Sequence, residues 1–174
     1  GIQTAALAFG GSTTVSTDAS EEYDGSTWTT SNIMNTARNA LAGSGIQTSA
    51  LAFVGRTTVQ LASTEQYDGI SWNTVHSMST ARRQLGGAGI APASLAFGGL
   101  STVVTAATEE FNSTIFSPAT GAWANGGNMG TARGELAGAG TQTEGLAFGG
   151  SVPPGATNSN STEEYNGSAW AAGG

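Results

Sequence analysis

A short pattern that recurs four times along the chain limits its fold more than any other feature of the sequence. Each copy opens with Leu-Ala-Phe, continues with an acidic piece that ends in an aromatic residue, and then reaches a single tryptophan. Three copies are followed by Thr-Ala-Arg. The tryptophans and these arginines keep the same place in every copy: Trp28, Trp72, Trp123 and Trp170, and Arg38, Arg82 and Arg133. Such a repeat indicates stacked structural units that bury a continuous core between neighbours.

The apolar pieces of each unit alternate as β-strands do. In residues 5–9 the leucine and the phenylalanine lie on one face and alanines lie on the other. Asp24-Gly25 separates the acidic piece from the tryptophan, and Asp-Gly predicts a hairpin with a type I′ turn. The stretch 39–43 predicts a fourth strand of small residues, with Gly45 marking the turn back to the next Leu-Ala-Phe. The sequence therefore predicts a four-stranded antiparallel meander in each unit.

A period of roughly 40–50 residues with four strands per unit is typical of β-propeller blades. The motifs resemble the kelch repeat, in which an apolar strand ends in Gly-Gly and is followed by an aromatic residue, a tryptophan and an arginine. The doublets here are Gly10-Gly11, Gly98-Gly99 and Gly149-Gly150, whereas the second unit has Val54-Gly55. The combination of Leu-Ala-Phe-Gly-Gly with Glu-Glu-Tyr-Asp-Gly is also similar to kelch-like repeats of bacteriophage and marine viral virion proteins. The resemblance implies an all-β, kelch-like β-propeller.

The predicted domain is a single kelch-like repeat domain over residues 1–174. Its blade units run approximately over residues 1–35, 36–79, 80–130 and 131–174, and the first lacks the strand that follows Thr-Ala-Arg. Kelch propellers close with more blades than these. Three arrangements are open: further blades belong to a longer chain, several copies complete one another, or a four-bladed disc closes with one strand missing.

Charge and composition exclude several classes of function. The chain has no cysteine and no lysine, and its net charge is −7. Nucleic acid is therefore an unsuitable partner, because neutralising phosphates requires clustered cations. No apolar run is long enough for a membrane-spanning helix, so we expect no membrane insertion. We expect no cofactor. The many glycines and alanines predict thin blades in which large side chains pack against small ones.

The residues that recur in every unit are interpreted as structural. The tryptophans could stack on sugars, but recurrence at a fixed register favours core packing. The acidic pieces could suggest a two-carboxylate glycosidase, but neighbouring strand residues point to opposite faces. We expect the first glutamate of each piece to pair with an arginine of a neighbouring blade, and an arginine ring that binds anions is the alternative. These glutamates are Glu21, Glu65, Glu109 and Glu163.

No constellation of residues predicts catalysis or a metal site. His76 is the only histidine, and no carboxylate lies near it in the sequence. An isolated imidazole without cysteine cannot build a transition-metal cluster. We therefore expect a solvated loop histidine, no catalytic residues and no metal.

The candidate ligand-binding residues lie where the repeat is interrupted, because insertions in repeat folds map to exposed loops. The third unit carries an insertion before its tryptophan, and the fourth has a longer loop after Leu-Ala-Phe. These two loops are expected on opposite rims. Their candidate residues are Asn112, Ser113, Thr114, Ser117 and Thr120 in the first, and Ser151, Asn158 and Asn160 in the second.

Together these features predict a non-enzymatic structural or recognition propeller of an extracellular or virion appendage, resembling a phage fibre. It would bind a surface glycan or a receptor protein through variable loops, and it would have other copies or other chains of a larger assembly as partners. A kelch-type adaptor for protein–protein interaction is the alternative. A propeller enzyme with catalytic residues outside this chain is a third interpretation.

Overall fold

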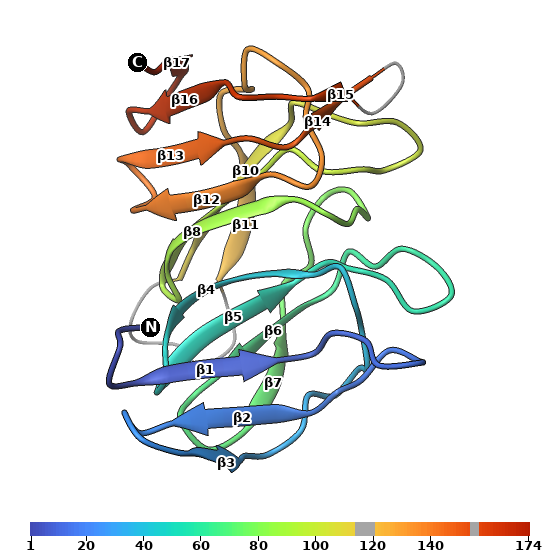
Figure 1. The fold of residues 1–174 in the computed structure, drawn as a ribbon, viewed down its shortest axis with the longest axis vertical. Helices are drawn as coiled ribbons and strands as arrows, with labels where there is room; N and C mark the ends of the chain where they lie inside the picture. The colour runs from blue at the N-terminus through green and yellow to red at the C-terminus, as the bar shows by residue number, and fades with distance from the viewer. Residues whose placement is uncertain (114–120, 154–156) are drawn as a thin grey trace.

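The computed structural model describes residues 1–113, 121–153 and 157–174, where the chain is all-β and contains no helix that could cross a membrane (Figure 1). Each of the four larger sheets is a meander of strands in chain order, and we number these four sheets as blades 1 to 4. Their strands are β1 (Ala6–Phe9), β2 (Ser20–Tyr23) and β3 (Trp28–Thr30); β4 (Ala42–Ile46), β5 (Ser49–Phe53), β6 (Thr64–Tyr67) and β7 (Trp72–Val75); β8 (Gly86–Ile90), β9 (Ala93–Phe97), β10 (Thr108–Asn112) and β11 (Ala122–Asn125); and β12 (Ala137–Gly140), β13 (Gly145–Phe148), β16 (Thr162–Tyr165) and β17 (Trp170–Ala172).

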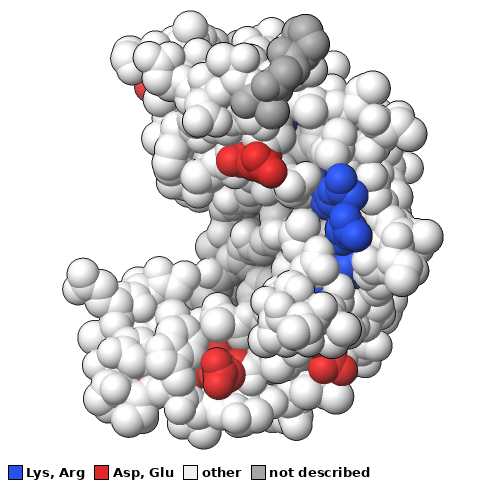
Figure 2. All heavy atoms as spheres, turned by 45° about the vertical axis from the view of Figure 1, so that its right-hand side comes forward, with Lys and Arg blue, Asp and Glu red and all other residues white. Residues whose placement is uncertain are grey.

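The blades stack along an arc. The innermost strand β8 of blade 3 contacts β4 of blade 2 and β12 of blade 4, and blade 1 has no strand in that place. Figure 1 shows blade 1 at one end of the arc and blade 4 at the other, and Figure 2 shows the arc open between them. The predicted all-β propeller blades are confirmed. The four-bladed disc, one of the three arrangements considered above, is not formed.

The loops lie on two rims, as the alternation of strand direction predicts. One rim carries the loops that follow β1, β5, β9 and β13 together with the connections between blades. The two kinds of segment pair there, since Asn39 and Gly134 of the connections form β-bridges with Arg56 and Ser151 of the loops. A small hairpin of β14 (Ser151–Val152) and β15 (Thr157–Asn158) extends this rim in blade 4. We call it the loop rim. The hairpin turns lie on the opposite rim.

The predicted position of the inner strand is wrong by a few residues. In blade 2 this strand begins at Ala42, not at Asn39, and it includes Gly45. The cause is the left-handed backbone of Ala40, whose φ of 50° interrupts the extended chain before the strand. The turn back to the next strand falls at residues 47–48.

The predicted type I′ turn is also wrong. Only Gly25 of the Asp24-Gly25 pair has a positive φ, of 99°, whereas a type I′ turn requires positive φ at both positions. The loop is instead held by the aspartate side chain. Its Oδ1 accepts hydrogen bonds from the backbone N–H groups of Ser26 and Thr27, each at 2.8 Å.

Neighbouring blades pack a large side chain on a glycine, as the composition predicts. A Cβ added at Gly87 would lie 2.9 Å from the ring of Phe53, and one at Gly138 would lie 2.4 Å from the ring of Phe97. Both phenylalanines are fully buried. Because the blades approach so closely, few large apolar residues are needed to fill the space between them.

The recurring arginines pair with glutamates inside one blade, and the expectation of pairs between neighbouring blades is wrong. Arg82 lies 3.0 Å from Glu109 of the same blade, and it also donates to the carbonyl groups of Gly98 and Ala107. The second carboxylate oxygen of Glu109 accepts from the backbone of Ser79. Each ion pair therefore fastens the connection that enters a blade to that blade's third strand. Arg38 pairs with Glu65, and Arg133 with Glu163, in the same way.

Candidate functional site

The recurring arginines cannot present a ring of cations to a ligand. The side chains of Arg38, Arg82 and Arg133 are completely buried. Burial lowers the pKa of Arg38 and of Arg82, against the opposing effect of the paired carboxylates. The anion-binding ring considered from the sequence is therefore not available at these residues. Glu21 occupies the equivalent place in blade 1 but is exposed, and no arginine of the described residues lies beside it.

The recurring aromatic residues lie between blades. Trp72 is 5% exposed, and Trp123 and Trp170 are partly buried against the same clusters as the phenylalanines. Trp28 in blade 1 differs, since half of its surface is exposed. The structure therefore places three tryptophans in packing positions and leaves one open at the end of the arc.

The structure separates the candidate loop residues. Asn112 ends β10 on the rim opposite the loop rim, where the backbone N–H of Ser113 donates to the carbonyl of Pro92. Ser151, Asn158 and Asn160 belong to the loop rim of blade 4, and Asn158 and Asn160 are exposed. Thr114, Ser117 and Thr120 lie outside the described residues. The two groups cannot contribute to one site.

A hollow on the loop rim brings together two other arginines, Arg56 and Arg83. It has a volume of about 750 Å³ and lies between blades 2 and 3. Figure 2 shows blue atoms beside the concave side of the arc, and these two are the only arginines that are not buried. Hydroxyl and amide side chains complete the polar lining: Thr58, Gln60, Ser79, Thr80, Ser101 and Thr102.

Backbone pairing fixes the position of both arginines. The N–H of Arg56 donates to the carbonyl of Asn39 at 2.9 Å, and that of Arg83 donates to Leu100 at 3.0 Å. Gln60 reaches from the loop of blade 2 to the carbonyl of Ser101 in blade 3, at 2.7 Å. Within the described part of the chain, no carboxylate lies at ion-pair distance from either guanidinium. Both cations are therefore available to an anionic ligand.

Sequence reasoning missed this pair, although a signal was present. The residues that correspond to Arg56 in the other units are Ser12, Leu100 and Ser151, and those that correspond to Arg83 are Asn39 and Gly134. Both arginines therefore depart from the repeat, whereas the three arginines considered as candidates follow it.

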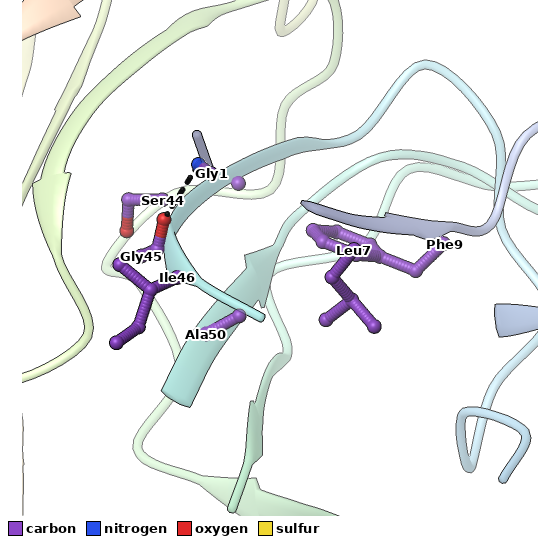
Figure 3. A pocket seen from close by; sticks show the side chains of 8 residues that line it. Gly1, Leu7, Phe9, Ser44, Gly45, Ile46 and Ala50 are labelled. Atoms are coloured by element: carbon purple, nitrogen blue, oxygen red, sulfur yellow. Dashed lines mark hydrogen bonds between the residues drawn. The ribbon is translucent and has the colours of Figure 1, made fainter. Parts of the chain in front are cut away.

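A second hollow, of about 240 Å³, lies beside the free edge of β1 (Figure 3). Figure 3 shows Leu7 and Phe9 on one side and the backbone of β4 on the other, where the N-terminal amino group donates to the carbonyl of Gly45. Its lining holds no charged side chain. The hollow lies beside the edge of β1 that an inner strand covers in the other blades.

No metal site is evident among the residues that the structure describes, since no group of three or more His, Cys, Asp or Glu side chains gathers there. His76 is exposed in the connection that follows β7. The lining of the arginine hollow includes no histidine, so His76 is not part of it.

Comparison with known proteins supports the fold alone. No family model matches the sequence, and no curated protein does. Among solved structures, YjhT is similar with a TM-score of 0.74 and 11% sequence identity. The match covers 91% of this chain and 53% of YjhT, so this chain spans about half the length of that protein. The structural similarity shows that the two share a β-propeller-like arrangement of blades, and an identity this low supports no more than the fold.

Proposed function

We propose that this chain is a non-enzymatic recognition module that binds a carboxylate-bearing glycan in the hollow between Arg56 and Arg83. One observation carries the proposal: two unpaired cations line a single hollow of about 750 Å³ in a chain whose net charge is −7. Guanidinium groups bind carboxylates through paired hydrogen bonds. The surrounding hydroxyl and amide groups suit the hydroxyls of a sugar.

The lining of the hollow supports binding without catalysis. It contains no aspartate, glutamate, histidine or tyrosine, which are the usual general acids and bases. The same proposal includes two further points. Residues 1–174 form one repeat domain of the kelch family, and the chain belongs to an extracellular or virion appendage. They rest on the repeat motifs of the sequence.

Calorimetric titration with D-glucuronate and D-glucose tests the proposal. The two sugars differ in the carboxylate, and we expect binding of glucuronate only. Replacing Arg56 or Arg83 with alanine should raise the Kd of glucuronate about tenfold or more, since a hydrogen bond to a charged group contributes about 1.5–3 kcal/mol.

Asn112→Ala and Asn158→Ala serve as matched controls, because they remove exposed polar side chains of the two loops outside the hollow. We expect both to bind glucuronate as the unchanged protein does. A loss of glucuronate affinity in Asn158→Ala as large as in the arginine variants would place the binding site in the loop of blade 4. Binding of a glutamate-rich peptide in place of glucuronate would favour a protein ligand, and equal binding of glucose would contradict the role of the arginines.

A further inference from the structure

The contacts between neighbouring blades repeat with a fixed direction. In each boundary the tryptophan of the later blade donates its indole N–H to a hydroxyl of the earlier blade, at 3.0 Å. The pairs are Trp72 to Ser20, Trp123 to Thr64, and Trp170 to Thr108. The later blade is thus always the donor and the earlier blade always the acceptor.

The same tryptophans meet a phenylalanine of the earlier blade edge to face. The ring centroids of Phe9 and Trp72 are 5.0 Å apart, and those of Phe97 and Trp170 are 4.9 Å apart. Phe53 and Trp123 repeat the contact at the middle boundary. Edge-to-face aromatic pairs at such distances are favourable beyond the area that they bury.

A hydrogen bond from tyrosine to glutamate is the third recurring contact. Tyr67 donates to Glu22, and Tyr165 donates to Glu110. Burial and the hydrogen bond to Glu110 raise the pKa of Tyr165 to about 12, so its hydroxyl stays a donor at neutral pH. At the middle boundary both partners change together, since Phe111 replaces the tyrosine and Gln66 replaces the glutamate.

The two ends of the arc carry the unmatched halves of these contacts. Blade 1 presents the donor half, and its Trp28 is half exposed. The ring centroids of Tyr23 and Trp28 lie 5.1 Å apart, the same distance as between Tyr67 and Trp72 in blade 2. Blade 4 presents the acceptor half. Phe148 is 38% exposed there, and Glu164 lies exposed beside Leu146 in a hollow of about 570 Å³.

We propose that blade 4 of one copy binds blade 1 of a second copy, head to tail. Trp28 of the second copy would pack against Phe148 and donate to the hydroxyl of Thr162, and Tyr23 would donate to Glu164. Every donor and acceptor then has the partner type that it has inside the chain. Because the two surfaces differ, the association is heterologous, and it forms a ring or a chain of copies according to the rotation between them. This contact does not involve the arginine hollow.

A disulfide trap uses a fourth contact between blades. The hydroxyl oxygens of Ser44 in β4 and Ser94 in β9 lie 2.5 Å apart across the middle boundary. The corresponding residues at the ends of the arc are Ala139, on the face of Leu146, and Ala6, on the face of Tyr23. The chain has no cysteine of its own, so Ala139→Cys and Ala6→Cys each introduce a unique thiol.

The experiment mixes the Ala6→Cys and Ala139→Cys proteins under mild oxidation and measures linked dimers by mass. We expect the mixed 6–139 dimer to be the main product, and each variant alone to remain largely unlinked. Adding Trp28→Ala to the first protein should abolish the mixed dimer. Val15→Ala, which changes another exposed apolar residue outside the contact, should leave its yield unchanged.

Two results would overturn the proposal. One is a yield of the mixed dimer no greater than that of Ala139→Cys mixed with Val15→Cys, whose thiol lies on the exposed loop after β1, outside the contact. The other is a yield that Trp28→Ala leaves unchanged. The proteins carry unaltered Arg56 and Arg83, so failure here is distinct from failure of glucuronate binding.

Discussion

Replacing Arg82 with methionine is expected to destabilise the protein by about 3–5 kcal/mol, since removal of one partner leaves the other charge buried and unpaired. Glu109, 2% exposed, would lose its counter-ion. The carbonyl groups of Gly98 and Ala107 would lose their donor as well. The connection into blade 3 would therefore lose the contacts that the Arg82 side chain makes with that blade.

Urea denaturation measures this effect, and the next residue in the chain supplies the control. Arg83 carries the same charge but has no ion-pair partner among the described residues, so Arg83→Met should change stability by less than about 0.5 kcal/mol. The double variant Arg82→Met/Glu109→Met should recover part of the loss, because neither charge remains. Equal destabilisation by Arg82→Met and Arg83→Met would contradict a structural role for the ion pair.

Replacing Phe53 with alanine should cost about 3–5 kcal/mol, the usual range for truncating a buried phenylalanine. Phe53 is 0% exposed and fills the space between Gly87 and Trp123. Phe148 holds the same place in the repeat but is 38% exposed, because no blade covers it. Phe148→Ala should therefore cost well under half as much.

Denaturation of both variants at a low protein concentration, where copies do not associate, makes this comparison. The sequence motif around the two phenylalanines is the same, Leu-Ala-Phe, so the local strand propensity is matched. A difference in stability then reports only what packs on the ring. Equal costs would mean that the face of blade 4 is covered in the same way as that of blade 2.

The repeat was sufficient to predict the blades, because spacing and alternation decide which residues pair and which face is buried. In blades 2 to 4, Leu-Ala-Phe became the second strand and the acidic piece with its aromatic residue became the third, and in blade 1, which lacks the inner strand, they became the first and the second. The split of each glutamate pair between two faces also follows from strand geometry. Glu109 turns to Arg82, whereas Glu110 turns to Tyr165 of the next blade.

The features that the repeat did not predict depend on backbone conformation and on contacts between distant residues. Nothing in the alternation signals the left-handed φ of Ala40, which shifts the inner strand. The partner of Arg82 depends on how the connection crosses the blade. Arg56 and Arg83 are distant in the sequence, and only the folded loop rim places them in one hollow.

The central claim is an arc of repeated contacts whose two end faces are open. Amide hydrogen exchange of the corresponding strands tests it most directly, because β1, β5, β9 and β13 share a sequence motif but differ in their neighbours. At low protein concentration we predict the slowest exchange in β5 and β9, faster exchange in β13, and the fastest in β1, which has no inner strand beside it. Equal protection of all four strands under these conditions would contradict the open arc.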